Sequence, residues 1–139
     1  MKISLKTMAA VLASAALSTP YGASAGAISS ISVVQFGAQV QPVVISQSSQ
    51  VNAVGVLQVG GSVPSASVVQ TGQNNFVGIL QFGGNTSANV GQVGETNVSF
   101  VGQSGGSANA VLGQIGQLNA GTVMQFGNVN SSTVVQIKP

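Results

Sequence analysis

Residues 70–81 have the sequence QTGQNNFVGILQ, and this stretch decides the fold of the chain. The same arrangement returns in residues 92–103 (QVGETNVSFVGQ) and in residues 114–125 (QIGQLNAGTVMQ). Each copy begins with Gln, has Gly two residues later and Asn five residues later, and ends at the Gln eleven residues on. A fixed period of this kind is the sequence signature of stacked repeats.

The glutamine series continues on both sides of these three copies. It comprises ten residues that are eleven or twelve positions apart: Gln35, Gln47, Gln58, Gln70, Gln81, Gln92, Gln103, Gln114, Gln125 and Gln136. Alternate members are followed five residues later by Asn52, Asn75, Asn97 and Asn119. The repeating unit is therefore about 22 residues long and has two unlike halves, so ten halves make about five units.

Each half-unit predicts a short strand and a turn. Val68 and Val69 are β-branched, and Gly72 and the dipeptide Gln73-Asn74 that follow are typical of turns. No half-unit is long enough for a stable helix, and no 3.6-residue period is visible. The repeat region, from about residue 29 to residue 138, is therefore predicted to be all-β.

The period also predicts how the strands stack. Side chains alternate between the two faces of a strand, so an inward Gln81 places Val77 and Ile79 inward with it, opposite Val68 and Gln70. Stacking the units at about 4.8 Å places like residues above one another, and each Gln amide can then bond the next one. Such a ladder satisfies polar groups that would be costly to bury alone. The prediction is a two-sheet parallel β-solenoid of cross-β type, with about five 22-residue strand-turn-strand rungs.

The predicted structural residues fall into two groups. The ten glutamines and four asparagines named above form the ladder, with the Gln35 series in one sheet and the Gln47 series in the other. The turn glycines follow Gln by two residues: Gly72, Gly83, Gly94, Gly105, Gly116 and Gly127. The two twelve-residue steps lie near Pro42 and Pro64, which predict turns and less regular N-terminal rungs.

Residues 1–25 have the organisation of a secretory signal peptide. Lys2 and Lys6 precede an apolar run over residues 8–17, and Ala23-Ser24-Ala25 gives the small-residue cleavage pattern. The apolar run is too short to span a bilayer. Cleavage after Ala25 would leave residues 26–139 as one repeat domain, in which Glu95 and Lys138 are the only charged side chains. A neutral chain lacks a basic surface for nucleic acid, and nothing repels its copies from one another.

The composition excludes most catalytic chemistry. Charged residues make up 3% of the chain, and it contains no His, no Cys, no Asp and no Arg. No catalytic triad can be built without His, and no pair of carboxylates can be built from one Glu. Thiolate or imidazole metal sites and disulfides are equally impossible. We therefore expect no enzyme activity, no cofactor, no metal and no small-molecule substrate.

The predicted stack would be about 24 Å tall, with unpaired backbone groups at its top and bottom. Such edges are templates for another copy, so end-to-end polymerisation is expected. Apolar side chains on the outward face leave two interpretations open, lateral or adhesive contact and simple strand propensity. These side chains are Phe36, Leu57, Val59, Leu80, Phe82, Met124 and Phe126. A non-polymerising surface-binding solenoid and Gly-rich disorder are the competing classes.

The spacing of Gln, Gly, Asn and the next Gln resembles that of curlin repeats. The resemblance covers nearly all of residues 26–139 and is weaker before Gln58. It implies a secreted structural subunit of an extracellular, cell-surface curli-type amyloid fibre that serves biofilm matrix and adhesion. It also implies export through the periplasm and an outer-membrane pore, with a chaperone and a nucleator as partners. Both a main subunit and a minor nucleating subunit fit this resemblance.

Overall fold

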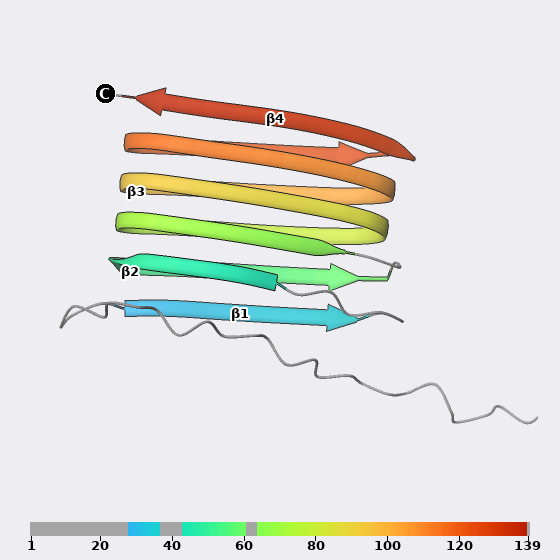
Figure 1. Ribbon diagram of the computed structural model, residues 1–139, viewed down its shortest axis with the longest axis horizontal. Helices are drawn as coiled ribbons and strands as arrows, with labels where there is room; N and C mark the ends of the chain where they lie inside the picture. The colour runs from blue at the N-terminus through green and yellow to red at the C-terminus, as the bar shows by residue number, and fades with distance from the viewer. Residues whose placement is uncertain (1–27, 37–42, 61–63, 139) are drawn as a thin grey trace, which may run out of the picture.

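The computed structural model describes residues 28–36, 43–60 and 64–138 of the chain. These residues form four elements, β1 (Ile28–Phe36), β2 (Val43–Val59), β3 (Ser65–Phe126) and β4 (Val129–Lys138). Neighbouring elements pair in parallel, in the order β1-β2-β3-β4. Figure 1 shows β1 at the bottom of the stack, β4 at the top and β3 winding between them. The described residues contain no helix, and the predicted parallel β-solenoid is confirmed.

The strands do not stop at the corners of the solenoid. β3 is 62 residues long and winds round the stack several times, where the sequence predicts separate short strands joined by turns (Figure 1). The reason is that the corners are stacked as regularly as the flat segments. Backbone groups at one corner therefore pair with the equivalent corner of the next level, and the β-ladder continues round the bend.

The winding creates two facing layers. Layer A contains residues 28–36, 51–59, 74–82, 96–104 and 118–126, and layer B contains residues 43–49, 66–72, 88–94, 110–116 and 132–138. Residues that pair between levels are 23 apart in the first part of the stack, as in Gln35 with Gln58, and 22 apart at its end, as in Gln114 with Gln136. The described residues make about four complete turns from the first level to the last, and each layer contains five levels, in agreement with the five rungs predicted.

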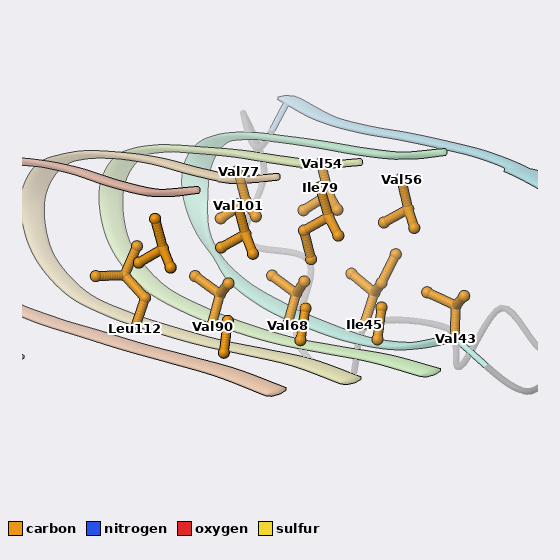
Figure 2. Close-up of a cluster of buried hydrophobic side chains, with 14 residues drawn as sticks. Val43, Ile45, Val54, Val56, Val68, Val77, Ile79, Val90, Val101 and Leu112 are labelled. Atoms are coloured by element: carbon orange, nitrogen blue, oxygen red, sulfur yellow. The ribbon is translucent and has the colours of Figure 1, made fainter. Parts of the chain in front are cut away.

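The core lies between the two layers and is made of aliphatic columns. In layer B, Ile45, Val68, Val90 and Leu112 occupy the same position at successive levels, two residues before the Gln. Figure 2 shows these side chains pointing at Val56, Ile79 and Val101 of layer A. β-branched residues suit such columns, because a stiff side chain on a pleated surface packs against its own copy one level away.

Two sequence predictions concern residues that the structure does not describe. The predicted signal peptide, residues 1–25, and Pro42 both lie outside the described ranges. Pro64 is buried and stands directly before the start of β3. Within the described part of the chain, no helix is long and apolar enough to cross a membrane.

Candidate functional site

The most regular feature of the structure is a pair of glutamine ladders inside the solenoid. In layer B, Nε2 of Gln70 donates to Oε1 of Gln92 over 2.9 Å, and Gln92 donates to Gln114 over 2.9 Å. In layer A, Gln81 donates to Gln103 over 2.9 Å, and Gln103 donates to Gln125 over 2.9 Å. The same bonds join the outer levels, as Gln35 to Gln58, Gln47 to Gln70, Gln58 to Gln81 and Gln114 to Gln136. All ten glutamines of the series therefore lie in two columns.

The glutamine amides from Gln81 to Gln136 also tie the two layers together. The second N–H of Gln92 reaches the backbone carbonyl oxygen of Phe76 in layer A, 3.2 Å away. Gln103 of layer A reaches the carbonyl oxygen of Ser87 on the opposite side over 3.0 Å. These bonds use the N–H groups of the amide, and its oxygen accepts from the Gln of the preceding level. Fully buried glutamines such as Gln92 and Gln114, both at 0% exposure, thus have protein partners for their amide groups.

A shorter asparagine ladder occupies one corner of the solenoid. Nδ2 of Asn97 donates to Oδ1 of Asn75 over 2.9 Å, and Asn119 donates to Asn97 over 3.0 Å. Asn52 is buried below them in the same column. Among the described residues, Nδ2 of Asn75 has no hydrogen-bond partner. In each Asn–Asn bond the donor is the residue nearer the C-terminus, whereas in each Gln–Gln bond the donor is the residue nearer the N-terminus. The two kinds of ladder therefore have opposite hydrogen-bond directions.

Ser99 is a ladder residue that the sequence analysis does not single out. It is fully buried in layer A, in the column that Val54 and Val77 occupy at lower levels. Its Oγ accepts from Nε2 of Gln92 over 2.8 Å and donates to Oε1 of Gln114 over 2.7 Å. The hydroxyl therefore bridges two rungs of the layer B ladder from the opposite layer. A polar residue at a position where other units carry Val is the signal that could have identified it.

The turn glycines adopt a backbone conformation that other residues rarely reach. All six predicted turn glycines have positive φ, as does Gly60, with values from 82° to 152°. A Cβ at Gly105 would lie 1.6 Å from the carbonyl oxygen of Gly127, and a Cβ at Gly94 would lie 1.8 Å from that of Gly116. Glycine is needed at these corners both for its φ and because consecutive corners stack in direct contact.

The opposite corner is less uniform. Thr86, Ala108 and Asn130 occupy equivalent inward positions there, and the Thr86 hydroxyl and the Asn130 Nδ2 are buried without a partner in the described part of the chain. An open hollow of about 580 Å³ lies along this corner over several levels, and most of the residues that line it are Ser, Asn and Thr. Three different residue types in one column cannot form the continuous ladder that the asparagine corner forms.

Both ends of the stack are open strand edges. Among the described elements, β1 pairs only with β2, and β4 pairs only with β3. At the C-terminal end, Nε2 of Gln125 and Nε2 of Gln136 each donate to a carbonyl oxygen of the opposite layer. An amide nitrogen has two donors, so each of these side chains keeps one N–H for a further level. The edge therefore presents both backbone and side-chain donors to an incoming strand.

The described residues offer little other chemistry. Glu95 and Lys138 are their only ionisable side chains, and both are exposed. No group of three or more potential metal ligands occurs among them. The ends of the described stack repeat the hydrogen-bonding pattern of its interior.

Comparison with known proteins identifies one segment. Residues 65–94 match the family model of the curlin associated repeat. This segment is the first part of β3 and includes Gln70, Asn75, Gln81 and Gln92. The resemblance expected from the sequence is confirmed there. No curated protein and no solved structure matches the chain.

Proposed function

We propose that this curlin-repeat protein is the main structural subunit of an extracellular curli-type amyloid fibre, built by end-to-end addition of copies. The observation that supports the proposal is that both ends of the stack, at β1 and β4, are open strand edges at which the glutamine ladders end. An exposed strand edge with unused donors and acceptors binds a further strand of matching spacing. A second copy of this chain supplies a strand with that spacing.

The ladder geometry specifies how two copies would meet. Gln125 and Gln136 end the two columns at one edge, and Gln35 and Gln47 begin them at the other. Because the donor in every Gln–Gln bond is the residue nearer the N-terminus, the C-terminal edge presents N–H groups. Stacking the C-terminal edge of one copy on the N-terminal edge of the next would continue both columns without a change of direction.

Location and partners are part of the same proposal. The signal-peptide pattern of residues 1–25 supports secretion, and a fibre with this repeat is proposed to lie at the cell surface, where it serves biofilm matrix and adhesion. Export through an outer-membrane pore, a chaperone and a nucleating subunit are proposed partners. The described residues of the last turn carry one basic side chain, Lys138, which we take to favour the main subunit over the minor nucleating subunit.

Fibre diffraction tests the proposal. The purified chain, incubated at neutral pH and aligned, should give reflections near ~4.7 Å and near ~10 Å. Preformed fibres should shorten the lag before assembly of fresh chain. Mass spectrometry of the material outside the producing cell should give a chain that starts at Gly26. A soluble monomer without these reflections would overturn the fibre and leave a solenoid that acts alone on a surface.

A further inference from the structure

The two outer faces of the solenoid differ in chemistry. Alternation of side chains along the strands turns every second residue of layer A outward, and all five phenylalanines of the chain are among these outward residues. They are Phe36, Phe76, Phe82, Phe100 and Phe126. We call the outward side of layer A the phenylalanine face. Apart from the polar side chains of Ser30, Ser32, Asn74, Thr96, Ser104 and Thr122, its described side chains are apolar or glycine.

Layer B presents a mixed surface instead. Its outward positions combine Val or Ile with Ser, Thr, Asn or Gly, as in Ser67, Val69 and Thr71, and carry no aromatic residue. The two ionisable side chains of the described residues, Glu95 and Lys138, both lie outside the phenylalanine face. The apolar character is therefore a property of one face, and strand propensity alone would have distributed the aromatic residues over both.

The phenylalanine face is exposed in the single chain. Phe126 is 70% exposed, and Phe76 and Phe82 are 50% and 40% exposed. The face is also indented: a hollow of about 300 Å³ lies over Gly55 and Gly78, with Leu57, Leu80 and Phe100 among its walls. Apolar patches on soluble monomers rarely exceed a few hundred Å². Five levels at ~4.8 Å and nine residues at ~3.3 Å give this face about 700 Å².

We propose that the phenylalanine face pairs with the phenylalanine face of a second copy, so that the fibre contains two solenoid filaments packed back to back. The inference rests on the proposed function, since it joins filaments that end-to-end growth has built. Two faces of about 700 Å² bury about 1,400 Å², which is the size of a stable protein interface. A two-fold axis lets the same patch serve both partners.

Three properties of the face select a second copy as its occupant. Identical faces without charge do not repel each other, so pairing has no electrostatic penalty. Both faces have the same level spacing, so a contact made at one level recurs at every level as the filaments lengthen. The hollow at Gly55 and Gly78 has room for an aromatic side chain of the opposing sheet, as interdigitation of two packed sheets requires.

Two glycines provide a matched pair of variants for the test. Gly55 lies in the phenylalanine face and Gly91 lies in the outer face of layer B, and a Cβ at either would meet no atom within 4 Å. Gly55→Lys and Gly91→Lys therefore make the same change in net charge at equally open positions. Only Gly55→Lys places like charges opposite each other in the proposed interface.

The measurement is the mass per length of fibres of the full chain by scanning transmission electron microscopy. Wild type and Gly91→Lys should contain two chains per ~24 Å, and Gly55→Lys should contain one, a twofold fall. The ~4.8 Å reflection should persist in all three. A double variant, Phe76→Thr with Phe82→Thr, should also give single filaments. Its control is the double variant Val93→Thr with Ile115→Thr in layer B, which should keep paired filaments.

The outcomes separate the two proposals. Wild-type fibres with one chain per ~24 Å, or a Gly55→Lys fibre that keeps two, would overturn the pairing and leave the fibre intact. Absence of the ~4.8 Å reflection from wild type would overturn the fibre itself. Single wild-type filaments that adsorb to alkyl-coated beads, with adsorption lost in Gly55→Lys, would assign the face to an apolar surface and also overturn the pairing.

Discussion

At the scale of single residues, the structure depends on amides that are buried and still fully bonded. The two N–H groups of Gln92 are shared among Gln114, Ser99 and the backbone carbonyl of Phe76, and its oxygen accepts from Gln70. Removing such a side chain leaves two neighbouring amides short of a partner in the buried interior. A buried polar group that loses its partner costs more free energy than the bond itself contributes.

Replacement of Gln92 by Ala should slow assembly and lower the guanidinium concentration at which the fibre dissociates. The expected loss is on the order of 3 kcal/mol per chain, from the cavity and the unpaired amides together. Gln117 is the control, because its side chain is exposed at a corner. Thioflavin fluorescence and denaturant titration would measure both effects, and equal behaviour of Gln92→Ala and Gln117→Ala would contradict the ladder.

At the scale of elements, the corners show how much the sequence could predict. The period of eleven predicted the parallel solenoid, because every strand carries the same inward pattern and only stacking buries all of them. It also predicted short strands with breaks between them, and β3 instead continues through the corners. The continuity could not be predicted from one unit, since it arises from pairing between corners at different levels.

Other features depend on differences between units. Ser99 occupies a position where the two preceding levels have Val. Its hydrogen-bond partners, Gln92 and Gln114, belong to the opposite layer, so the alternation pattern of its own strand does not reveal them. Gly121 follows it in the column, and a Cβ there would lie 2.9 Å from Nε2 of Gln114. The two glutamines without a following glycine, Gln47 and Gln136, lie in the first and last levels of layer B. Deviations from the repeat therefore mark the ends and the crowded places of the stack.

Substitution of the corner glycines should have effects that depend on stacking. Gly105→Ala should prevent the corner from forming and destabilise the solenoid by at least ~3 kcal/mol, since the Cβ would overlap Gly127 and φ is 152°. Gly127→Ala retains the unfavourable φ, but its nearest atom is 3.5 Å away, so its effect in the isolated chain should be smaller. Gly91→Ala, at an open position, should be tolerated.

Circular dichroism and denaturant midpoints of the three glycine variants would check this order. A Gly105→Ala variant as stable as Gly91→Ala would show that the corners do not stack in contact. If Gly127→Ala assembles as poorly as Gly105→Ala while its monomer is more stable, another copy must occupy the space above Gly127, as end-to-end addition requires.

At the scale of the whole molecule, the absence of charge from the interior governs the response to solution conditions. The ladders use neutral amides where other proteins use ion pairs, and the two ionisable side chains of the described residues are exposed. Among the described residues no ionisable side chain is buried, so their interior contains no group whose protonation could be coupled to folding.

Stability should accordingly be almost independent of pH. The guanidinium midpoint of the fibre should be the same at about pH 4 and at about pH 9, because the interior carries no side chain with a pKa in that range. High salt should also leave the guanidinium midpoint almost unchanged, because the described interior has no ion pairs for salt to screen. Chemical denaturation followed by light scattering at the two pH values would measure this. A midpoint that falls steeply on either side of neutrality would mean that an ionisable group outside the described residues is coupled to the core.

The direction of the glutamine bonds has a consequence for the assembled object. Each side-chain amide carries a dipole, and the two glutamine columns align their dipoles along the stacking axis, while the single asparagine column opposes them. The dipoles of the two glutamine columns exceed that of the one asparagine column. The stack therefore has a net side-chain dipole along its axis, and its two ends differ. A filament that inherits this asymmetry has a leading tip and a trailing tip with different chemistry, so it can lengthen vectorially, away from wherever its first copy was anchored.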